Sequence, residues 1–379
     1  MWFKQGAHVG FEVKRRKTRT CMVGDRPVGG DHLVAVQTMT KTKTHDVPGT
    51  LKQIHGAQER GVDIVRVACP DEKSALALPA IIEGSRVPII ADIHFAPGLA
   101  LKALEAGVHC VRINPGNIKL ELVQKIVALA KDKGAAIRIG VNSGSIMPRK
   151  GLEVKQDMEF VMADLMVDTA VEWCEQFDKW GFHNFKVSLK SSDVLTTIYT
   201  NREFAKKTDV PLHLGVTEAG MLQASTVKSS MGLGTLLGEG IGDTIRVSIT
   251  GDPLDEVDVG YEILSGLRLR KKNVEIVACP SCGRDEVDGG VETLAREVEE
   301  RLRDYTGNIV VSVLGCIVNG PGEAAEADLG IAGAKDAGYL FKGETILRRV
   351  PNEKLVDELM IELVKMERER ASETAQAGA

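Results

Sequence analysis

The sequence has little of what marks several familiar classes of protein. Aromatic residues make up 4% of its 379 residues and the formal net charge is −5, which argues against a nucleic-acid-binding surface. No apolar run is long enough to span a bilayer. Residues 1–20 lack the apolar core of a signal peptide. We therefore expect a cytoplasmic protein with neither a nucleic-acid nor a membrane partner.

Cysteine and histidine are also scarce, which limits the metal sites that the chain can build. The seven cysteines are an odd number and too few for a disulfide scaffold, so we expect free thiols in a reducing compartment. No histidine lies beyond His213, which excludes a local zinc site of three cysteines and one histidine near the C-terminus. No Walker sequence or H-E-x-x-H motif is present, and Gly232–Gly238 has the wrong spacing for a dinucleotide fingerprint.

Three of the cysteines form a pattern typical of a metal centre. Cys279 and Cys282 make a C-x-x-C motif, and Cys316 lies in a second Gly/Pro-rich turn after the apolar run Ile309–Leu314. Structural zinc takes four ligands, and a four-iron cluster is usually held by four thiolates. With three thiolates, one iron of a cluster can bind an oxygen ligand or a substrate. The alternative is a redox-active or structural C-x-x-C with Cys316 buried as a small apolar residue.

Strand-like and helix-like segments alternate through the first two thirds of the chain. The predicted strands are Leu33–Met39, Asp63–Ala68, Pro88–His94, Cys110–Ile113, Ala136–Val141, Asn184–Ser188, Pro211–Val216 and Thr244–Ile249. The predicted helices include Gly98–Ala106, Leu120–Lys133, Met158–Trp180, Val194–Lys206 and Leu254–Leu269. Such alternation indicates parallel pairing, and eight units predict an α/β fold with a closed (β/α)8 TIM barrel.

Polar residues occupy alternate positions in six of these strands. Side chains two residues apart share a face, so we expect one set to point into the barrel lumen. The set comprises Arg66, Asp92, His94, Arg112, Asn114, Arg138, Asn142, Lys186, Ser188, Lys190, Arg246, Ser248 and Thr250. Clustered buried cations are unstable without anions, so the pattern predicts an anionic, phosphorylated ligand, with Asp92 and Glu218 as partial partners. Alternatively, some of these cations pair with acids at the rim and never touch a ligand.

The remaining chain predicts a second, smaller α+β domain. We expect an N-terminal arm and hairpin over residues 1–30, the barrel over 31–267, the second domain over 268–368 and a disordered tail over 369–379. The second domain's predicted strands are Val274–Ala278, Ile309–Leu314, Asp328–Ala332, Tyr339–Phe341 and Glu344–Leu347, and its helices are Val291–Tyr305 and Asn352–Arg368.

Six segments carry a resemblance to a known family. They are Val36–Thr40, Arg112–Ile118, Gly140–Ser145, Gly240–Ser248, Cys279–Arg284 and Gly315–Glu323. Together they resemble the two-domain bacterial 4-hydroxy-3-methylbut-2-enyl diphosphate synthases, over about Arg19 to Glu367. The resemblance implies a barrel joined to an iron–sulfur domain similar to sulfite reductase modules. It implies reductive ring opening and dehydration of 2-C-methyl-D-erythritol 2,4-cyclodiphosphate with two electrons, in non-mevalonate isoprenoid biosynthesis.

The same resemblance implies roles for individual residues. Cys279, Cys282, Cys316 and Glu323 would bind a 4Fe-4S cluster, with Glu323 the exchangeable ligand of the fourth iron. The implied substrate-binding residues are Arg66, Arg112, Asn114, Arg138, Asn142, Lys186, Ser188, Arg246 and Ser248, and the candidates for proton transfer are Asp92, His94 and Glu218. Reduced flavodoxin or ferredoxin would supply the electrons. A head-to-tail homodimer would let one chain's cluster close the other chain's barrel. Thr38 stands where the family more often has serine.

Two other functions fit parts of the pattern. A barrel transferase of the pterin-binding kind would share the anion-binding lumen and use the C-terminal cysteines for structural zinc. An RNA-binding protein would use the basic N-terminus and Arg268–Lys272, although the net charge disfavours it.

Overall fold

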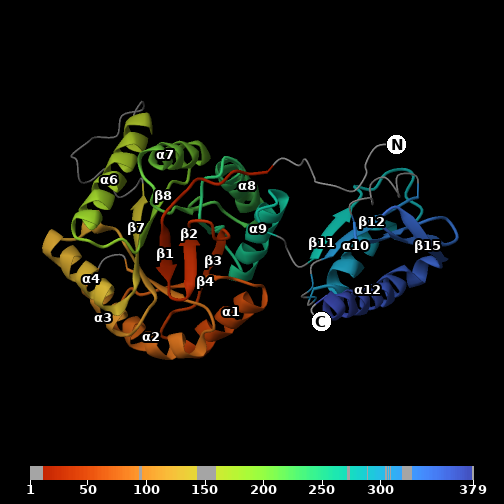
Figure 1. Cartoon of the computed structure of the whole chain (residues 1–379), viewed down its shortest axis with the longest axis horizontal. Coiled ribbons are helices and arrows are strands. Elements are labelled where there is room, and N and C mark those ends of the chain that lie inside the picture. Colours follow the sequence, from red (N-terminus) through yellow and green to blue (C-terminus); the bar gives the residue numbers. More distant parts are fainter. Residues whose placement is uncertain are drawn as a thin grey trace. The chain divides into compact units, whose positions relative to one another are not determined.

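The computed structural model describes residues 12–93, 96–142, 159–270, 274–287, 289–303, 305, 307, 309–317 and 327–377. The chain divides into two compact units, Met1–Arg270 and Lys271–Ala379 (Figure 1). None of the helices in the described residues is both long and apolar enough to cross a membrane. Two predicted site residues, His94 and Glu323, lie outside the described residues.

The first unit is the predicted TIM barrel. Its strands are β3 (Ala35–Met39), β4 (Ile64–Ala68), β5 (Ile89–Asp92), β6 (Cys110–Ile113), β7 (Ala136–Asn142), β8 (Phe185–Lys190), β9 (His213–Leu214) and β10 (Thr244–Ile245). They pair in parallel in the order β8-β7-β6-β5-β4-β3-β10-β9. A parallel bridge between Val187 and Leu212 joins β8 to β9 and so completes the ring.

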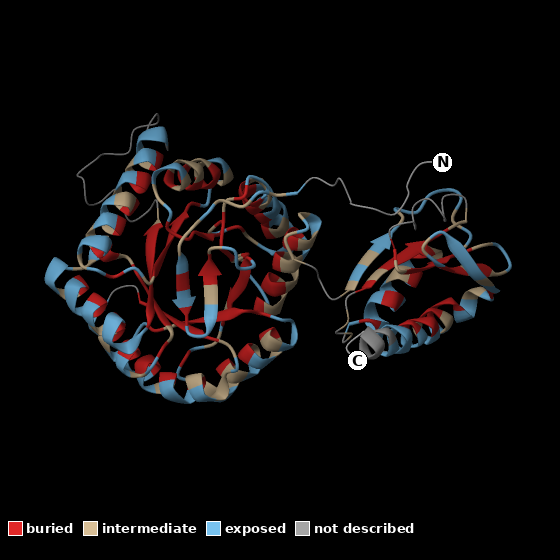
Figure 2. Cartoon of the chain, in the orientation of Figure 1, coloured by how far each residue is buried: buried red, intermediate tan, exposed pale blue. Residues whose placement is uncertain are grey.

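Helices surround these strands and bury their apolar faces against them (Figure 2). They are α1 (Val47–Glu59), α2 (Glu72–Gly84), α3 (Gly98–Glu105), α4 (Leu120–Lys133), α6 (Glu159–Lys179), α7 (Val194–Lys207), α8 (Leu222–Gly238) and α9 (Pro253–Gly266). Aspartates cap several N-termini, because a carboxylate before the first turn accepts an otherwise unpaired backbone N–H. Asp46, Asp71, Asp193 and Asp252 begin α1, α2, α7 and α9 in this way.

A β-hairpin covers the N-terminal end of the barrel. Strands β1 (Thr20–Val23) and β2 (Arg26–Gly29) pair antiparallel. Cys21, Val23 and Val28 are fully buried, and they form one apolar cluster with residues at the starts of five barrel strands, namely Ala35, Ile64, Ile90, Cys110 and Ala136. This packing leaves the C-terminal ends of the strands for a ligand.

Period-two alternation separates the two faces of the strands as predicted. Val65, Val67, Ile137 and Ile139 lie in the large apolar cluster that joins the strands to the helices. The alternate positions Arg66, Arg112 and Arg138 are buried polar residues outside that cluster. The lumen therefore holds charge where an ordinary barrel holds branched apolar side chains.

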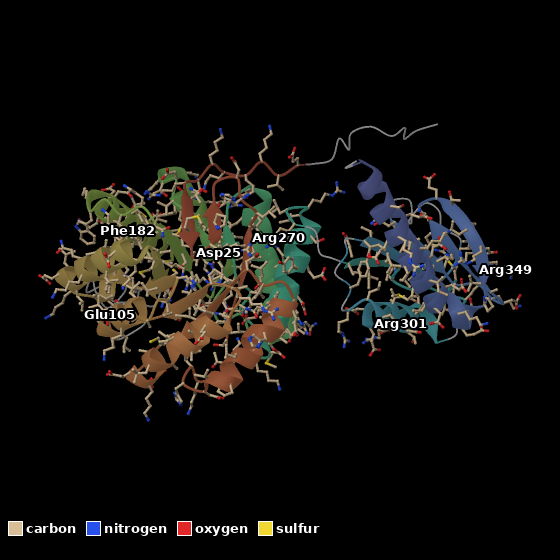
Figure 3. All side chains as sticks on the ribbon, turned by 60° about the horizontal axis from the view of Figure 1, so that its bottom comes forward. Asp25, Glu105, Phe182, Arg270, Arg301 and Arg349 are labelled. Carbon is tan, nitrogen blue, oxygen red and sulfur yellow. The ribbon has the colours of Figure 1, made fainter. Side chains whose placement is uncertain are left out.

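The last residue of the first unit is firmly anchored. The Arg270 guanidinium donates to Asp63 and, at 3.2 Å, to the carbonyl of Val34. Arg270 is labelled in Figure 3. Its guanidinium also lies over the ring of Tyr261, 4.9 Å from the centroid. A cation–π contact and an ion pair with a buried carboxylate together fix the chain at this point.

The second unit is built on a five-stranded sheet in sequential order. Its strands are β11 (Val274–Ala278), β12 (Ile309–Leu314), β13 (Leu329–Ala332), β14 (Gly338–Lys342) and β15 (Thr345–Val350). β11, β12 and β13 pair in parallel, and β14 and β15 add antiparallel pairs. Helices α10 (Gly290–Arg301) and α12 (Leu355–Ala377) share an apolar core with this sheet, and the short 3-10 helix η3 (Asn352–Lys354) precedes α12.

The boundaries of several elements differ from the predictions, most clearly those of β5, β9, β10 and α12. β9 and β10 are two residues long, shorter than predicted. The two chains approach closely just after these strands, where a Cβ atom added to Gly215 would lie 2.7 Å from the carbonyl oxygen of Arg246. β5 ends at Asp92, before His94. Helix α12 continues to Ala377, past the predicted end at Arg368 and through most of the expected disordered tail. Alanine and glutamate are strong helix formers, and this segment is rich in both.

Candidate functional site

Two arginines flank one carboxylate, Asp92, in the lumen, and a third arginine lies on the next strand. Asp92 Oδ2 lies 3.8 Å from Arg66 Nε, and Asp92 Oδ1 lies 3.5 Å from Arg112 Nη1. Arg138 is paired in register with Arg112 on the neighbouring strand. All four side chains are buried. Burial lowers the pKa of Arg66 to about 10, and Asp92 opposes that shift.

Two buried cations of the lumen, Arg138 and Lys186, have side-chain nitrogen atoms that are not satisfied within the described residues. Arg138 Nε and Nη1 and Lys186 Nζ have no hydrogen-bond partner among the described residues. Burial lowers the pKa of both groups, and the neighbouring Arg66 and Arg112 lower that of Arg138 further. Buried polar atoms are normally satisfied by protein, water or ligand, so this part of the lumen is suited to an anion.

The two lysines of β8 have different surroundings. The groups that act on the pKa of Lys186 include the thiols of Cys21 and Cys110, which lie at the hairpin end of the barrel. Lys190 is near the four arginines of the lumen, and burial first and then these charges hold its pKa well below the ordinary value. Lys190 therefore has more arginines near it than Lys186, which is paired in register with Arg138 and lies closer to the hairpin. Sequence reasoning had placed both in the lumen but chose only Lys186 as a substrate ligand.

Arg246 has a partner that the sequence did not reveal. Its Nε donates to Glu256 Oε2 at 3.0 Å and its Nη2 to Glu256 Oε1 at 2.8 Å. Glu256 belongs to the first turns of α9 and is fully buried. Glu218, which we expected to compensate the lumen cations, is exposed, and its φ of 53° is in the left-handed region. The signal that could have found Glu256 is the Asp252-Pro253 helix start, since carboxylates favour first turns.

The predicted polar groups at the strand ends occupy the C-terminal side of the barrel. Asn114 precedes the short 3-10 helix η1 (Pro115–Asn117), and Asn142 is the last residue of β7. With its amide oxygen turned toward the lumen, Asn142 accepts from Arg112 Nη2 at 3.2 Å. Ser188 is buried and donates to the carbonyl of Ile139 at 3.5 Å. Ser248 is half-buried and follows β10.

The cysteine pattern lies on two neighbouring loops of the second unit. Cys279 follows β11 and Cys316 follows β12, which pair in parallel up to Ala278 and Val313. The Gly315 N–H donates to Cys279 Sγ at 3.2 Å. Asp285 holds the C-x-x-C loop by accepting from Ser281 Oγ at 2.9 Å and from the N–H of Val291, at the start of α10, at 2.9 Å.

The donor set suits thiolate chemistry, although Glu323 is outside the described residues. Cys279, Cys282 and Cys316 are free thiols, with Cys282 exposed. Within the described ranges, no group of three or more histidine, cysteine or acidic side chains is arranged to hold a metal ion. Three thiols with a backbone N–H aimed at one sulfur fit an iron–sulfur cluster better than zinc, which needs a fourth sulfur or nitrogen ligand.

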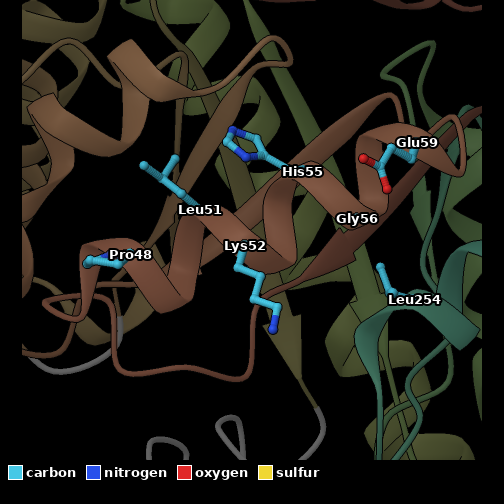
Figure 4. Close-up of a pocket in the computed structure, with 7 residues that line it drawn as sticks. All are labelled: Pro48, Leu51, Lys52, His55, Gly56, Glu59 and Leu254. Carbon is cyan, nitrogen blue, oxygen red and sulfur yellow. The ribbon is translucent and has the colours of Figure 1, made fainter.

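A separate groove lies on the outer surface of the barrel, between α1 and α9 (Figure 4). Leu51, Lys52, His55 and Glu59 line it from α1, and Leu254 lines it from α9. None of the predicted site residues contributes to this groove.

Comparison with known families accounts for both units. The family model described as the GcpE TIM-barrel domain matches residues 18–261, and that described as the GcpE protein C-terminal domain matches residues 275–365. The 4-hydroxy-3-methylbut-2-en-1-yl diphosphate synthase (flavodoxin) of Aquifex aeolicus is 49% identical over 94% of this chain and 99% of its own length. The chain belongs to this family.

Other relatives in the family cover the chain to the same extent. The synthase of Geobacillus kaustophilus is 47% identical over 95% of each chain, and that of Clostridium perfringens is 49% identical over 92% of this chain and 98% of its own. Among solved structures, dihydropteroate synthase from Stenotrophomonas maltophilia shares the barrel fold, with a TM-score of 0.50 and 13% identity over 66% of this chain and 98% of its own. At that identity the likeness concerns the fold alone.

Proposed function

We propose that this chain catalyses the reductive ring opening and dehydration of 2-C-methyl-D-erythritol 2,4-cyclodiphosphate to 4-hydroxy-3-methylbut-2-enyl diphosphate. The reaction is a step of non-mevalonate isoprenoid biosynthesis in the cytoplasm. The observation that carries this proposal is the lumen, where nitrogen atoms of the buried Arg138 and Lys186 side chains have no hydrogen-bond partner in the part of the chain that is described. A relative with 49% sequence identity to this chain carries the name of the synthase.

The charge of the lumen suits a cyclic diphosphate. Ion pairs in the described residues join the cations to two carboxylates, Asp92 and Glu256. The cations themselves number six and are Arg66, Arg112, Arg138, Lys186, Lys190 and Arg246. Arginine offers paired N–H groups that match two oxygens of a phosphate, which favours Arg112 and Arg138 as the main contacts. Asn114, Asn142, Ser188 and Ser248 add neutral polar groups near the mouth.

The second unit would hold the cofactor. Cys279, Cys282, Cys316 and Glu323 would ligate a 4Fe-4S cluster. Such a cluster supplies electrons and an iron whose oxygen ligand can exchange. Asp285 fixes the C-x-x-C loop, and Gly315 directs its N–H to Cys279, so both would constrain the ligands.

Protons and electrons need separate routes. Asp92, His94 and Glu218 are our candidates for proton transfer; Asp92 lies beside two arginines, and Glu218 is exposed at the end of β9. Reduced flavodoxin or ferredoxin would supply electrons, and the relatives are named for flavodoxin. We also propose a head-to-tail homodimer, in which one chain supplies the barrel and the other the cluster.

The decisive experiment is metal analysis with electron paramagnetic resonance on anaerobically purified, dithionite-reduced protein. We expect about four irons per chain, as for a 4Fe-4S cluster, and a signal that changes when the cyclic diphosphate is added. One zinc with no iron and no signal would refute the proposal and leave a barrel transferase with a structural metal.

A further inference from the structure

Glu256 is a fully buried carboxylate that gathers donors from several parts of the barrel. Its Oε2 accepts from Thr38 Oγ1 at 2.7 Å and from Arg246 Nε at 3.0 Å. Its Oε1 accepts from Lys41 Nζ at 2.7 Å, from Arg246 Nη2 at 2.8 Å and from the Ile249 N–H at 3.2 Å. The donors come from β3, from the loop after it and from the segment that follows β10.

This arrangement leaves the carboxylate no capacity for a ligand. A carboxylate has about four lone-pair sites, and five donors already point at Glu256. With a side chain that has no exposed surface, Glu256 is also out of reach of solvent. Its chemical role must therefore be exerted through the groups that it holds.

The group that it holds most tightly is the Arg246 guanidinium. Two parallel N–H···O bonds fix the plane of that group, which leaves Nη1 directed away from Glu256. The charge of Arg246 acts on both Arg66 and Lys190, so the fixed guanidinium lies among the lumen cations. Lys41 is held in the same way by Glu256 and by the Ile249 carbonyl, and its side chain remains one-third exposed (33%).

We propose that Glu256 is a positioning residue that presents Arg246, together with Lys41, to the anionic part of the substrate. The inference rests on the proposed function, and it adds Lys41 to the anion-binding groups. A guanidinium that is oriented before binding loses less rotational freedom when the ligand arrives, and so the ligand binds more tightly. A purely structural Glu256 would stabilise the α9 contact without altering ligand affinity.

The test compares Glu256→Gln with Asp258→Asn in the anaerobic, cluster-loaded protein. Both substitutions remove one negative charge from α9, but Asp258 pairs with Arg60 and both side chains are about two-fifths exposed. The measurement is the dissociation constant of 2-C-methyl-D-erythritol 2,4-cyclodiphosphate by calorimetry, with KM and kcat. We expect Glu256→Gln to weaken substrate binding about tenfold to a hundredfold, which is the usual loss when a residue that orients a ligating side chain is removed. The effect on KM should be larger than the effect on kcat. Asp258→Asn should bind as the parent does.

A mutant cycle separates positioning from stability. Adding Glu256→Gln to a variant that carries both Arg246→Ala and Lys41→Ala should change the dissociation constant less than about twofold, because both groups to be positioned are already absent. If Glu256→Gln does not fold, Glu256→Asp, which keeps the charge but withdraws it by one methylene, should show an intermediate loss of affinity.

Two results would overturn the inference. One is a Glu256 variant with a lowered melting temperature and unchanged affinity; the other is a Glu256→Gln effect on affinity that is fully additive with the combined removal of Arg246 and Lys41. Failure of the unsubstituted protein to bind the cyclic diphosphate would instead refute the proposed function itself, and the positioning role with it.

Discussion

Replacing Arg138 with methionine should make the ligand-free protein more stable and abolish its response to substrate. Arg138 is 1% exposed, and its Nε and Nη1 have no partner in the described residues. Burying a charge without full compensation costs several kcal/mol, and apolar replacements of buried charged groups are often stabilising by about 1–4 kcal/mol. We expect a gain in that range for Arg138→Met, which keeps most of the side-chain volume.

The assay is denaturant unfolding with and without 2-C-methyl-D-erythritol 2,4-cyclodiphosphate. A ligand at a hundred times its dissociation constant stabilises a binding protein by about 2.7 kcal/mol. The unsubstituted chain should show that increment and Arg138→Met should not. Arg202→Met is the control, since it removes a surface ion pair with Glu239 and should change stability by about 0–1 kcal/mol. A ligand-free Arg138→Met protein that is several kcal/mol less stable would refute the reasoning, because it would mean that the guanidinium is compensated in the free protein.

Three further predictions address other parts of the chain. Cys282→Ser should lose iron and activity while circular dichroism still reports a folded barrel; full activity without iron would contradict the cluster. Arg112→Ala should weaken substrate binding by about 2–5 kcal/mol, the usual cost of truncating one partner of a buried charge pair, and unchanged affinity by calorimetry would contradict its phosphate role. Burial and the lumen cations hold the pKa of His213 well below its ordinary 6.5. The unfolded chain therefore binds the extra proton first, so unfolding free energy should fall as pH drops below about 6.5, and His213→Gln should flatten that slope.

The lumen could be predicted from sequence because its signal is local. Arg66, Arg112 and Arg138 alternate with apolar residues in short strands, and alternation alone assigns them to one face. Alternation does not show which end of the barrel is closed, and so it does not show how near a side chain lies to that end. Lys186 and Lys190 share a parity, and the packing of the hairpin near Cys110 shows that the end of the strand nearer Lys186 is the closed one.

Glu256 escaped prediction because its partners are distant in the chain. Thr38 is 218 residues away, and an acidic residue in an amphipathic helix is normally exposed to solvent. Glu218, at the end of a predicted strand, matched the expected position of a site residue better, yet its side chain is exposed. The three cysteines needed no such long-range information, since adjacent strands place their loops together.

The hairpin Thr20–Gly29 closes the barrel at the end where its strands begin. Substrate and product must then use the same opening, so each turnover requires the product diphosphate to leave before the next substrate can enter. Any compound that binds at the C-terminal ends of the strands would block substrate entry and product release together. Substitutions that loosen the packing of Cys21, Val23 and Val28 would let water reach the charged lumen from the hairpin end, without changing any residue at the opposite end of the barrel.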